Sequence, residues 1–183
     1  GNQTVSVEYN GTTVGTINAT VKDYIASVVI TAPSKITYKY NEELDLSDAK
    51  VTITMASKPN APTTISVTPS MISGYNKTQV GAQTVTITYT DSENKVHNQT
   101  FGVTVKDAIK TITLENNNFK TNYKYGENLN LSGLSLKVTK ESGATTTVSV
   151  TSGMISGYNP NKLGNQTLTI NYEGKQFTIV VNV

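Results

Sequence analysis

Apolar residues recur at every second position in short runs along the whole chain. In most runs, one residue that is usually polar or small stands between two apolar residues. The runs are Val28 and Ile30; Leu44 and Leu46; Val51 and Ile53; Ile65 and Val67; Val85 and Ile87; Phe101, Val103 and Val105. Because neighbouring side chains of a strand point to opposite faces, this period predicts antiparallel strands with one buried face.

A repeat divides the sequence. Residues 71–76, Met-Ile-Ser-Gly-Tyr-Asn, recur without change at 154–159, 83 positions later. Residues 38–44 return at 123–129 with an offset of 85 positions. The difference falls in 56–63, a Pro-containing stretch that we predict to be an exposed loop. Each repeat holds six or seven strand-like runs, which is typical of a two-sheet sandwich.

The start of the chain matches only the last third of the repeat. Val21-Lys22-Asp23 recurs as Val105-Lys106-Asp107, where the first whole repeat ends. We therefore predict a truncated preceding module, represented only by its two C-terminal strands, followed by two whole modules. The predicted boundaries are 1–23 for the truncated module, and 24–107 and 108–183 for the whole modules.

Residues 1–23 are predicted to form a hairpin that turns at Asn10-Gly11, a sequence that favours tight two-residue turns. An isolated hairpin is only marginally stable in water, and its open edges favour pairing. We expect this one to associate with the hairpin or with a sheet edge of a second molecule, as a consequence of the truncation. The predicted contact is an apolar face made by Val5, Val7, Tyr9, Ile17, Ala19 and Val21.

The motifs at 125–134, 156–159 and 163–167 together resemble the bacterial immunoglobulin-like domain of group 3. The resemblance covers both whole modules and, weakly, the hairpin. The first module departs from it by having Asn41 where the second has the usual Gly126. The resemblance implies an all-β fold of tandem immunoglobulin-like antiparallel β-sandwiches. It also implies a spacer or adhesion module on the surface or wall of Gram-positive bacteria, with no catalytic residues.

Composition and charge narrow the range of partners. The formal net charge is +2, charged residues make up 15% of the chain, and the lysines are dispersed. We therefore expect no nucleic-acid partner, because no row of basic residues is available to neutralise phosphates. No apolar run approaches 18 residues and no signal peptide is present, which predicts a soluble interior segment without membrane insertion. The absence of Cys excludes disulfides and thiol chemistry.

Two features offer candidate chemistry. His97 is the single histidine, in the stretch 91–97 that we predict to be an exposed hairpin tip without metal partners. The acidic stretch 42–48 contains carboxylates of the kind that bind Ca²⁺, but the second module keeps only Glu127 of them. We interpret this stretch as a solvated strand edge, and expect no metal, no cofactor and no enzymatic activity.

The tyrosine pairs Tyr38/Tyr40 and Tyr123/Tyr125 are predicted to place two rings each on one strand face. The rings either close one end of the core or form a ligand surface. The predicted function is a non-catalytic spacer or adhesion segment, stiffened by the short junction at 105–109. The alternative is a binding module whose ligand is a glycan or a protein of the host or of the cell wall. The tyrosines or the loop tips would form its binding surface.

Overall fold

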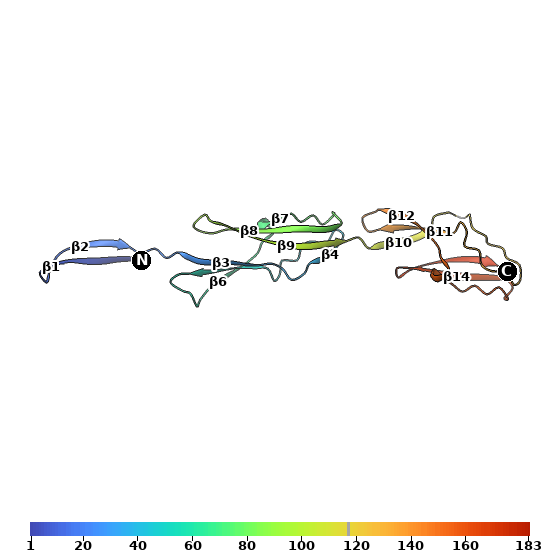
Figure 1. Ribbon diagram of the computed structural model, residues 1–183, viewed down its shortest axis with the longest axis horizontal. Coiled ribbons are helices and arrows are strands. Elements are labelled where there is room, and N and C mark those ends of the chain that lie inside the picture. The colour runs from blue at the N-terminus through green and yellow to red at the C-terminus, as the bar shows by residue number, and fades with distance from the viewer. Residues whose placement is uncertain (117) are drawn as a thin grey trace. The chain divides into compact units, whose positions relative to one another are not determined.

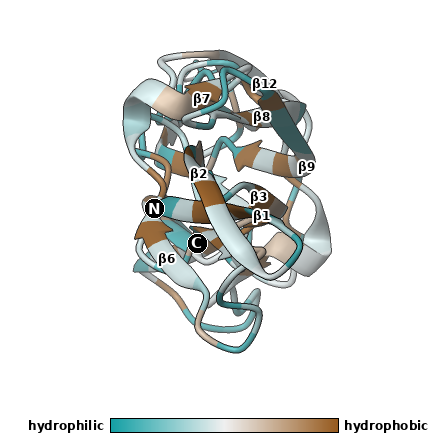
Figure 2. Ribbon diagram, turned by 90° about the vertical axis from the view of Figure 1, so that its left-hand side faces the viewer, coloured by the Kyte–Doolittle hydropathy of each residue, from teal (hydrophilic) through white to brown (hydrophobic). Residues whose placement is uncertain are grey.

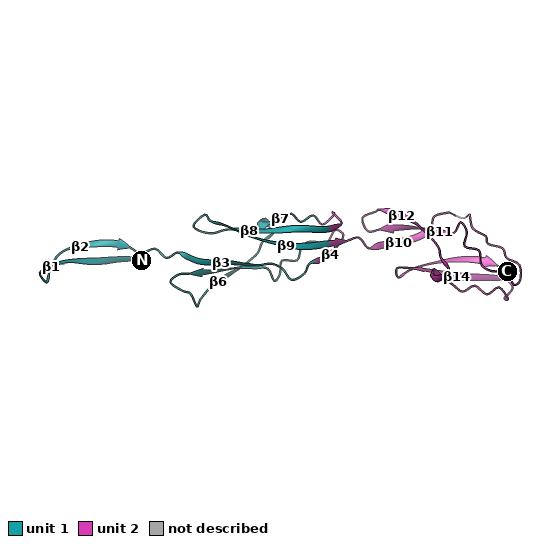
Figure 3. Ribbon diagram, viewed as in Figure 1, with its two compact units in different colours: residues 1–36, 43–76, 82–104 teal, residues 37–42, 77–81, 105–183 magenta. Residues whose placement is uncertain are grey.

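The computed structural model describes residues 1–116 and 118–183, and these form β-strands, loops and two single-turn 3-10 helices (Figure 1). The all-β prediction is confirmed. We call 1–23 the hairpin, 24–107 the first repeat and 108–183 the second repeat. The chain divides into two compact units (Figure 3). One unit contains residues 1–36, 43–76 and 82–104, and the other contains 37–42, 77–81 and 105–183.

The hairpin consists of β1 (Asn2–Tyr9) and β2 (Thr12–Thr20), which pair only with each other. Asn10 and Gly11 both have positive φ, 49° and 75°. Two successive residues of this kind form the turn whose twist matches that of the paired strands. The predicted turn is therefore confirmed.

The first repeat contains two sheets, in the strand orders β3-β5-β6 and β4-β9-β8-β7, and β4 runs parallel to β9. The strands of the first sheet are β3 (Ile25–Thr31), β5 (Lys50–Met55) and β6 (Thr63–Ser66). Those of the second sheet are β4 (Thr37–Lys39), β7 (Ile72–Ser73), β8 (Gly81–Thr90) and β9 (Val96–Lys106). The 3-10 helix η1 (Pro69–Met71) precedes β7, where Pro fits the first helical turn.

The second repeat has the sheets β10-β11-β12 and β13-β14-β15, and an isolated parallel bridge between Asn122 and Asn182 replaces the pairing of β4. The first sheet contains β10 (Ile109–Leu114), β11 (Ser135–Lys140) and β12 (Thr145–Ser149). After η2 (Ser152–Met154), the second contains β13 (Ile155–Ser156), β14 (Asn165–Tyr172) and β15 (Lys175–Asn182). The connection between β14 and β15 is the two-residue turn Glu173-Gly174, with φ of 44° and 78°.

The core of each repeat lies between its two sheets. In the second repeat, Leu136 and Val138 of β11 face Leu168 and Ile170 of β14 in one buried cluster. The alternation appears as brown and pale bands along the strands (Figure 2). We expected a core in the first repeat at Val28, Leu44, Val51, Ile53, Val85, Ile87, Phe101 and Val103, and the structure buries four of these fully and four partly. The buried ones are Val51, Val85, Ile87 and Val103, and the partly buried ones are Val28, Leu44, Ile53 and Phe101.

The prediction of a strand at Leu44 and Leu46 is wrong. Residues 40–49 contain no strand, although both leucines are partly buried. The chain turns instead at Asp45, whose Oδ1 accepts a hydrogen bond of 3.0 Å from the backbone N–H of Ser47. A short acidic side chain that bonds to a nearby amide competes with strand pairing, and the two-residue apolar period cannot reveal this.

Candidate functional site at the linkers and loops of the repeats

The linker between the hairpin and the first repeat is held by Asp23. One carboxylate oxygen, Oδ1, accepts hydrogen bonds from the backbone N–H groups of Tyr24 (3.0 Å) and Ser57 (3.1 Å). The other, Oδ2, accepts a bond from the Ser57 hydroxyl. In addition, the backbone N–H of Ala56 donates to the carbonyl oxygen of Tyr24 at 2.9 Å. The turn after β5 is thus bonded to the linker by both side chain and backbone.

The same arrangement recurs between the two repeats. Asp107 accepts from the backbone N–H of Ser142 at 3.0 Å and from its hydroxyl at 2.6 Å. The backbone N–H of Glu141 donates to the carbonyl oxygen of Ala108 at 2.9 Å. We call this arrangement the linker clasp. Both clasps join the linker to the turn that follows β5 or β11, the middle strand of the first sheet of the next repeat.

The clasps favour the ionised carboxylate. The hydroxyl of Ser57 lowers the pKa of Asp23 below its ordinary value of 3.8, and the hydroxyl of Ser142 does the same for Asp107. A lowered pKa means that the clasp contributes stability above pH 3.8, which is lost as the pH falls through the pKa of the folded state. At neutral pH both clasps carry a full charge, which strengthens their hydrogen bonds.

The repeated glutamines hold the Ser-Gly-Tyr-Asn loops. Gln166 accepts from the backbone N–H of Asn159 at 2.8 Å and donates to its carbonyl oxygen at 2.8 Å. It also donates to the carbonyl oxygen of Lys162 at 2.6 Å. In the first repeat, Gln83 makes the same two bonds with Asn76, at 2.7 and 2.8 Å. The repeated Gln is therefore a loop anchor.

The glycine of this loop is required by close approach as well as by conformation. Gly74 has a φ of +85°, and a Cβ added there would lie 2.4 Å from the carbonyl oxygen of Thr84. Gly157 has a φ of +99°, and its Cβ would lie 2.8 Å from the carbonyl oxygen of Thr167. No side chain can occupy either position without moving the backbone. The recurrence of this glycine in both repeats thus has a structural cause.

Three carboxylates of the acidic stretch 42–48, those of Glu42, Asp45 and Asp48, accept hydrogen bonds from backbone amides. Glu42 accepts a hydrogen bond of 2.7 Å from the backbone N–H of Lys39, and Asp48 accepts one of 3.0 Å from Ser34. In the second repeat, Asn130 bonds to the amide two residues later, just as Asp45 does. An amide oxygen can accept this bond as well as a carboxylate, so the charge itself is not required. Among the described residues, no group of three potential ligands could hold a metal ion.

The four candidate tyrosines do not share an exposed strand face. Tyr38 and Tyr123 are buried, with 1% and 7% of their surfaces exposed, and Tyr40 is partly buried. Tyr125 is 66% exposed. The pairs separate because the chain turns at Tyr40-Asn41 and at Tyr125-Gly126. Asn41 adopts a φ of 64°, close to the 76° of Gly126, so the departure at this position preserves the turn.

The buried ring of Tyr123 closes one end of the second repeat. Its hydroxyl donates to the carbonyl oxygen of Lys120 (3.0 Å), and the backbone N–H of Asn130 donates to it at 3.3 Å. The ring lies 5.3 Å from that of Tyr158, whose hydroxyl donates to the carbonyl oxygen of Glu127 at 2.6 Å. Both hydroxyls are bonded to loop backbone, so these tyrosines hold loops rather than present free rings.

The prediction that His97 is an ordinary exposed residue is wrong. It lies on β9 rather than on the hairpin tip, and its side chain is only 18% exposed. Its Nε2 lies 2.8 Å from Oδ2 of Asp91, whose other oxygen accepts from the backbone N–H groups of Glu93 and Lys95, both at 2.9 Å. The hydrogen bond from His97 is the main cause of the lowered pKa of Asp91. The pair orders a loop that is longer than the two-residue turn of the second repeat.

The comparison with known families decides the identity of the fold. The bacterial Ig-like domain, group 3, matches residues 31–105 and 117–183. The chain belongs to this family. The resemblance expected from the motifs and the tandem Ig-like β-sandwich fold are therefore confirmed. No curated protein matches the chain.

Ig-like domains of this group are commonly structural or surface modules, and they are typically extracellular and non-enzymatic. Among the described residues, no helix is long and apolar enough to span a membrane. The linker clasp was not among the predicted features, although its signal is visible in the sequence. The aspartate recurs at the end of each Val-Lys-Asp motif, and Ser57 and Ser142 occupy the same position in the repeats.

Proposed function

We propose that this chain is a non-catalytic spacer segment of a Gram-positive cell-surface protein. In this role it holds a more distal domain away from the cell wall. The observation that carries the proposal is the linker clasp, which occurs in the same form at Asp23 and at Asp107. The family match supports the surface location, since domains of this group are commonly surface modules.

The clasp removes freedom from linkers that are already short. Only Asp107 and Ala108 separate β9 from β10. The side chain of the first is bonded to Ser142, and the carbonyl oxygen of the second to Glu141. Fixing the backbone of one residue removes conformational freedom worth roughly 1–2 kcal/mol. A linker that has lost this freedom in the folded repeat cannot bend at that point unless the bonds of the clasp break. A spacer needs this resistance, because a freely bending chain does not hold its ends apart.

Single-molecule energy transfer between the two repeats tests this proposal. The chain contains no Cys, so dyes can be attached to cysteines introduced at the exposed positions Ser92 and Lys175. We expect a narrow distribution of transfer efficiencies for the wild type. Replacement of Asp107 by Ala, which removes both side-chain bonds of the clasp, should broaden it.

Asp45→Ala is the matched control, because it also removes an aspartate that bonds to the backbone N–H of a serine, but within a loop. This variant should keep the narrow distribution of the wild type. The proposal is wrong if the wild-type distribution is as broad as that of Asp107→Ala, or if the two substitutions broaden it equally.

A further inference from the structure

A short parallel pairing joins an early part of the second repeat to its last strand. Asn122 forms an isolated parallel bridge with Asn182, the last residue of β15. The backbone N–H of Asn182 donates to the carbonyl oxygen of Thr121 at 2.8 Å. The backbone N–H of Tyr123 donates to the carbonyl oxygen of Asn182, also at 2.8 Å. Because residues 121–123 follow β10 along the chain, the pairing connects the stretch after the first strand of the repeat directly to the last strand.

The first repeat has the same kind of pairing between β4 and β9. The backbone N–H of Thr104 donates to the carbonyl oxygen of Ile36 at 2.8 Å, and that of Tyr40 donates to the carbonyl oxygen of Lys106 at 2.9 Å. Here too the paired stretch follows the first strand of the repeat, β3, and its partner β9 is the last strand. We call this parallel contact the end-strand pairing in both repeats.

Buried side chains lie beside the end-strand pairing. In the second repeat, Tyr123 is buried, and so is Val181, which precedes the bridge residue Asn182. In the first repeat, Tyr38 is buried in the middle of β4, and Val105 is buried on β9. A hydrogen bond in such surroundings is electrostatically stronger than one in water. The first tyrosine of each Tyr-Lys-Tyr motif therefore shields the bonds of this pairing.

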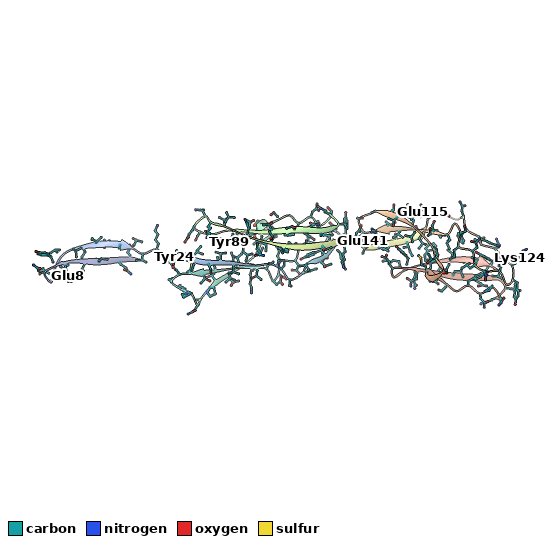
Figure 4. The ribbon with its side chains drawn as sticks, viewed as in Figure 1. Glu8, Tyr24, Tyr89, Glu115, Lys124 and Glu141 are labelled. Carbon is teal, nitrogen blue, oxygen red and sulfur yellow. The ribbon has the colours of Figure 1, made fainter. Side chains whose placement is uncertain are left out.

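The direction of the paired stretches determines how tension acts on them. In Figure 4, Glu141 and Lys124 lie at opposite ends of the second repeat. The linker residue Ala108 is bonded to Glu141, and the end-strand pairing adjoins Lys124. A lengthwise pull therefore draws residues 121–123 towards the linker and draws Asn182 the opposite way. Since the stretches run parallel and their hydrogen bonds lie across them, this pull slides one stretch along the other and loads both bonds together.

We propose that the end-strand pairing makes each repeat resistant to tension, so that the repeat stays folded when the chain is pulled lengthwise. Hydrogen bonds that are loaded together must break together, whereas bonds loaded from one end break one after the other. A pairing of a few bonds can therefore oppose stretching. This function goes beyond that of a spacer, because resistance to bending depends on the linkers and resistance to stretching depends on bonds inside each repeat.

Magnetic tweezers at constant force, with the full chain, test the proposal. The chain contains no Cys, so one attachment can be a cysteine that replaces Lys110 or Lys124, both of which are exposed. The other attachment is a handle joined to Val183. Force applied at Lys110 slides the paired stretches, whereas force applied at Lys124 peels them apart from one end. We expect the second repeat to unfold at least about 10-fold more slowly when it is pulled from Lys110, because both bonds must then break together.

A proline on β15 shows whether the end-strand pairing itself provides the resistance. Asn182→Pro removes the N–H that donates to Thr121. Under the pull from Lys110 it should raise the unfolding rate about 10-fold, as loss of one backbone hydrogen bond does. Val180→Pro is the matched control, because Val180 lies two residues earlier on β15 and its N–H points to the same side, outside the bridge. It should change the rate by less than about 3-fold, since proline is tolerated at a strand edge.

Asn182→Ala is the control for the side chain of Asn182. It loses the bond from Asn182 to the side chain of Asn165 and keeps the backbone pairing, so its unfolding rate should also change by less than about 3-fold.

Equal unfolding rates from the two attachment points would overturn the proposal. Equal acceleration by Asn182→Pro and by either control would also overturn it. The comparison of attachment points involves no proline, so it gives a decisive result even if Asn182→Pro does not fold. The spacer proposal does not depend on this outcome, because energy transfer detects bending at the linker in the absence of load.

Discussion

The two repeats share their loop geometry but not their charges. Gly74 and Gly157 both have positive φ beneath a strand carbonyl oxygen, and Gln83 and Gln166 anchor the same loop. In contrast, Asp45 becomes Asn130 while the local hydrogen bond is kept. Where only one acceptor oxygen is needed, an amide replaces the acid. The linker aspartates are retained at both positions, where two oxygens accept bonds from an amide and a hydroxyl.

The largest effect should come from the loop glycines. Gly74→Ala is expected to destabilise the first repeat by roughly 4 kcal/mol, because backbone strain is added to the collision with Thr84. Gly81→Ala is the control, since its φ is also positive, +110°, but no atom lies within 4 Å of the added Cβ. It should cost roughly 2 kcal/mol, from strain alone. Urea unfolding followed by NMR signals of each repeat measures both, and equal losses would disprove the role of the collision.

The next largest loss of stability should come from a substitution of the loop glutamine. Gln166→Met keeps the length of the side chain but leaves the backbone groups of Asn159 without their partner, which should cost about 1–3 kcal/mol. Gln3→Met makes the same change at the equivalent position of the hairpin, where the side chain is exposed. Its cost should stay below about 0.5 kcal/mol. Similar losses of unfolding free energy at the two positions would contradict the assignment of Gln166 as a loop anchor.

A smaller difference between the repeats should appear at acid pH. Asp91 has a lowered pKa because His97 and the amides of Lys95 and Glu93 stabilise its ionised form. Its contribution to stability is therefore complete above pH 3.8 and is lost as the pH falls through the pKa of the folded state. Thermal unfolding between about pH 2 and 6 should show a stability advantage of the wild type over Asp91→Asn that declines with acid.

The second repeat is an internal control for this pH effect. It has the turn Glu173-Gly174 where the first repeat has the loop ordered by Asp91. Its NMR signals should therefore show the same acid unfolding profile in the wild type and in Asp91→Asn. An advantage of the wild type that is constant with pH would show that the carboxylate acts without its charge.

The sequence was sufficient to predict what depends on periodicity and repetition. It predicted the strands, the sandwich and the turn at Asn10-Gly11, because period two and paired turn residues report directly on local backbone geometry. It failed at Leu44 and Leu46, where a side-chain bond of Asp45 determines the backbone. It also failed for His97, because the pairing with Asp91 depends on strand register across a loop. The linker clasp joins residues 34 or 35 positions apart, a distance that periodicity does not encode.

The hydrogen bonds of Asp23 and Asp107 make each linker a structural part of the repeat that follows it. The most direct test is the backbone order parameter of Ala108 and Tyr24 from ¹⁵N relaxation. Both amides should have values of about 0.85, as in a rigid strand. Ser142→Ala removes the hydroxyl bond to Asp107, and should lower the value at Ala108 while leaving Tyr24 unchanged. Wild-type values below about 0.6 at both amides would show that the linkers are flexible and are not held by the repeats.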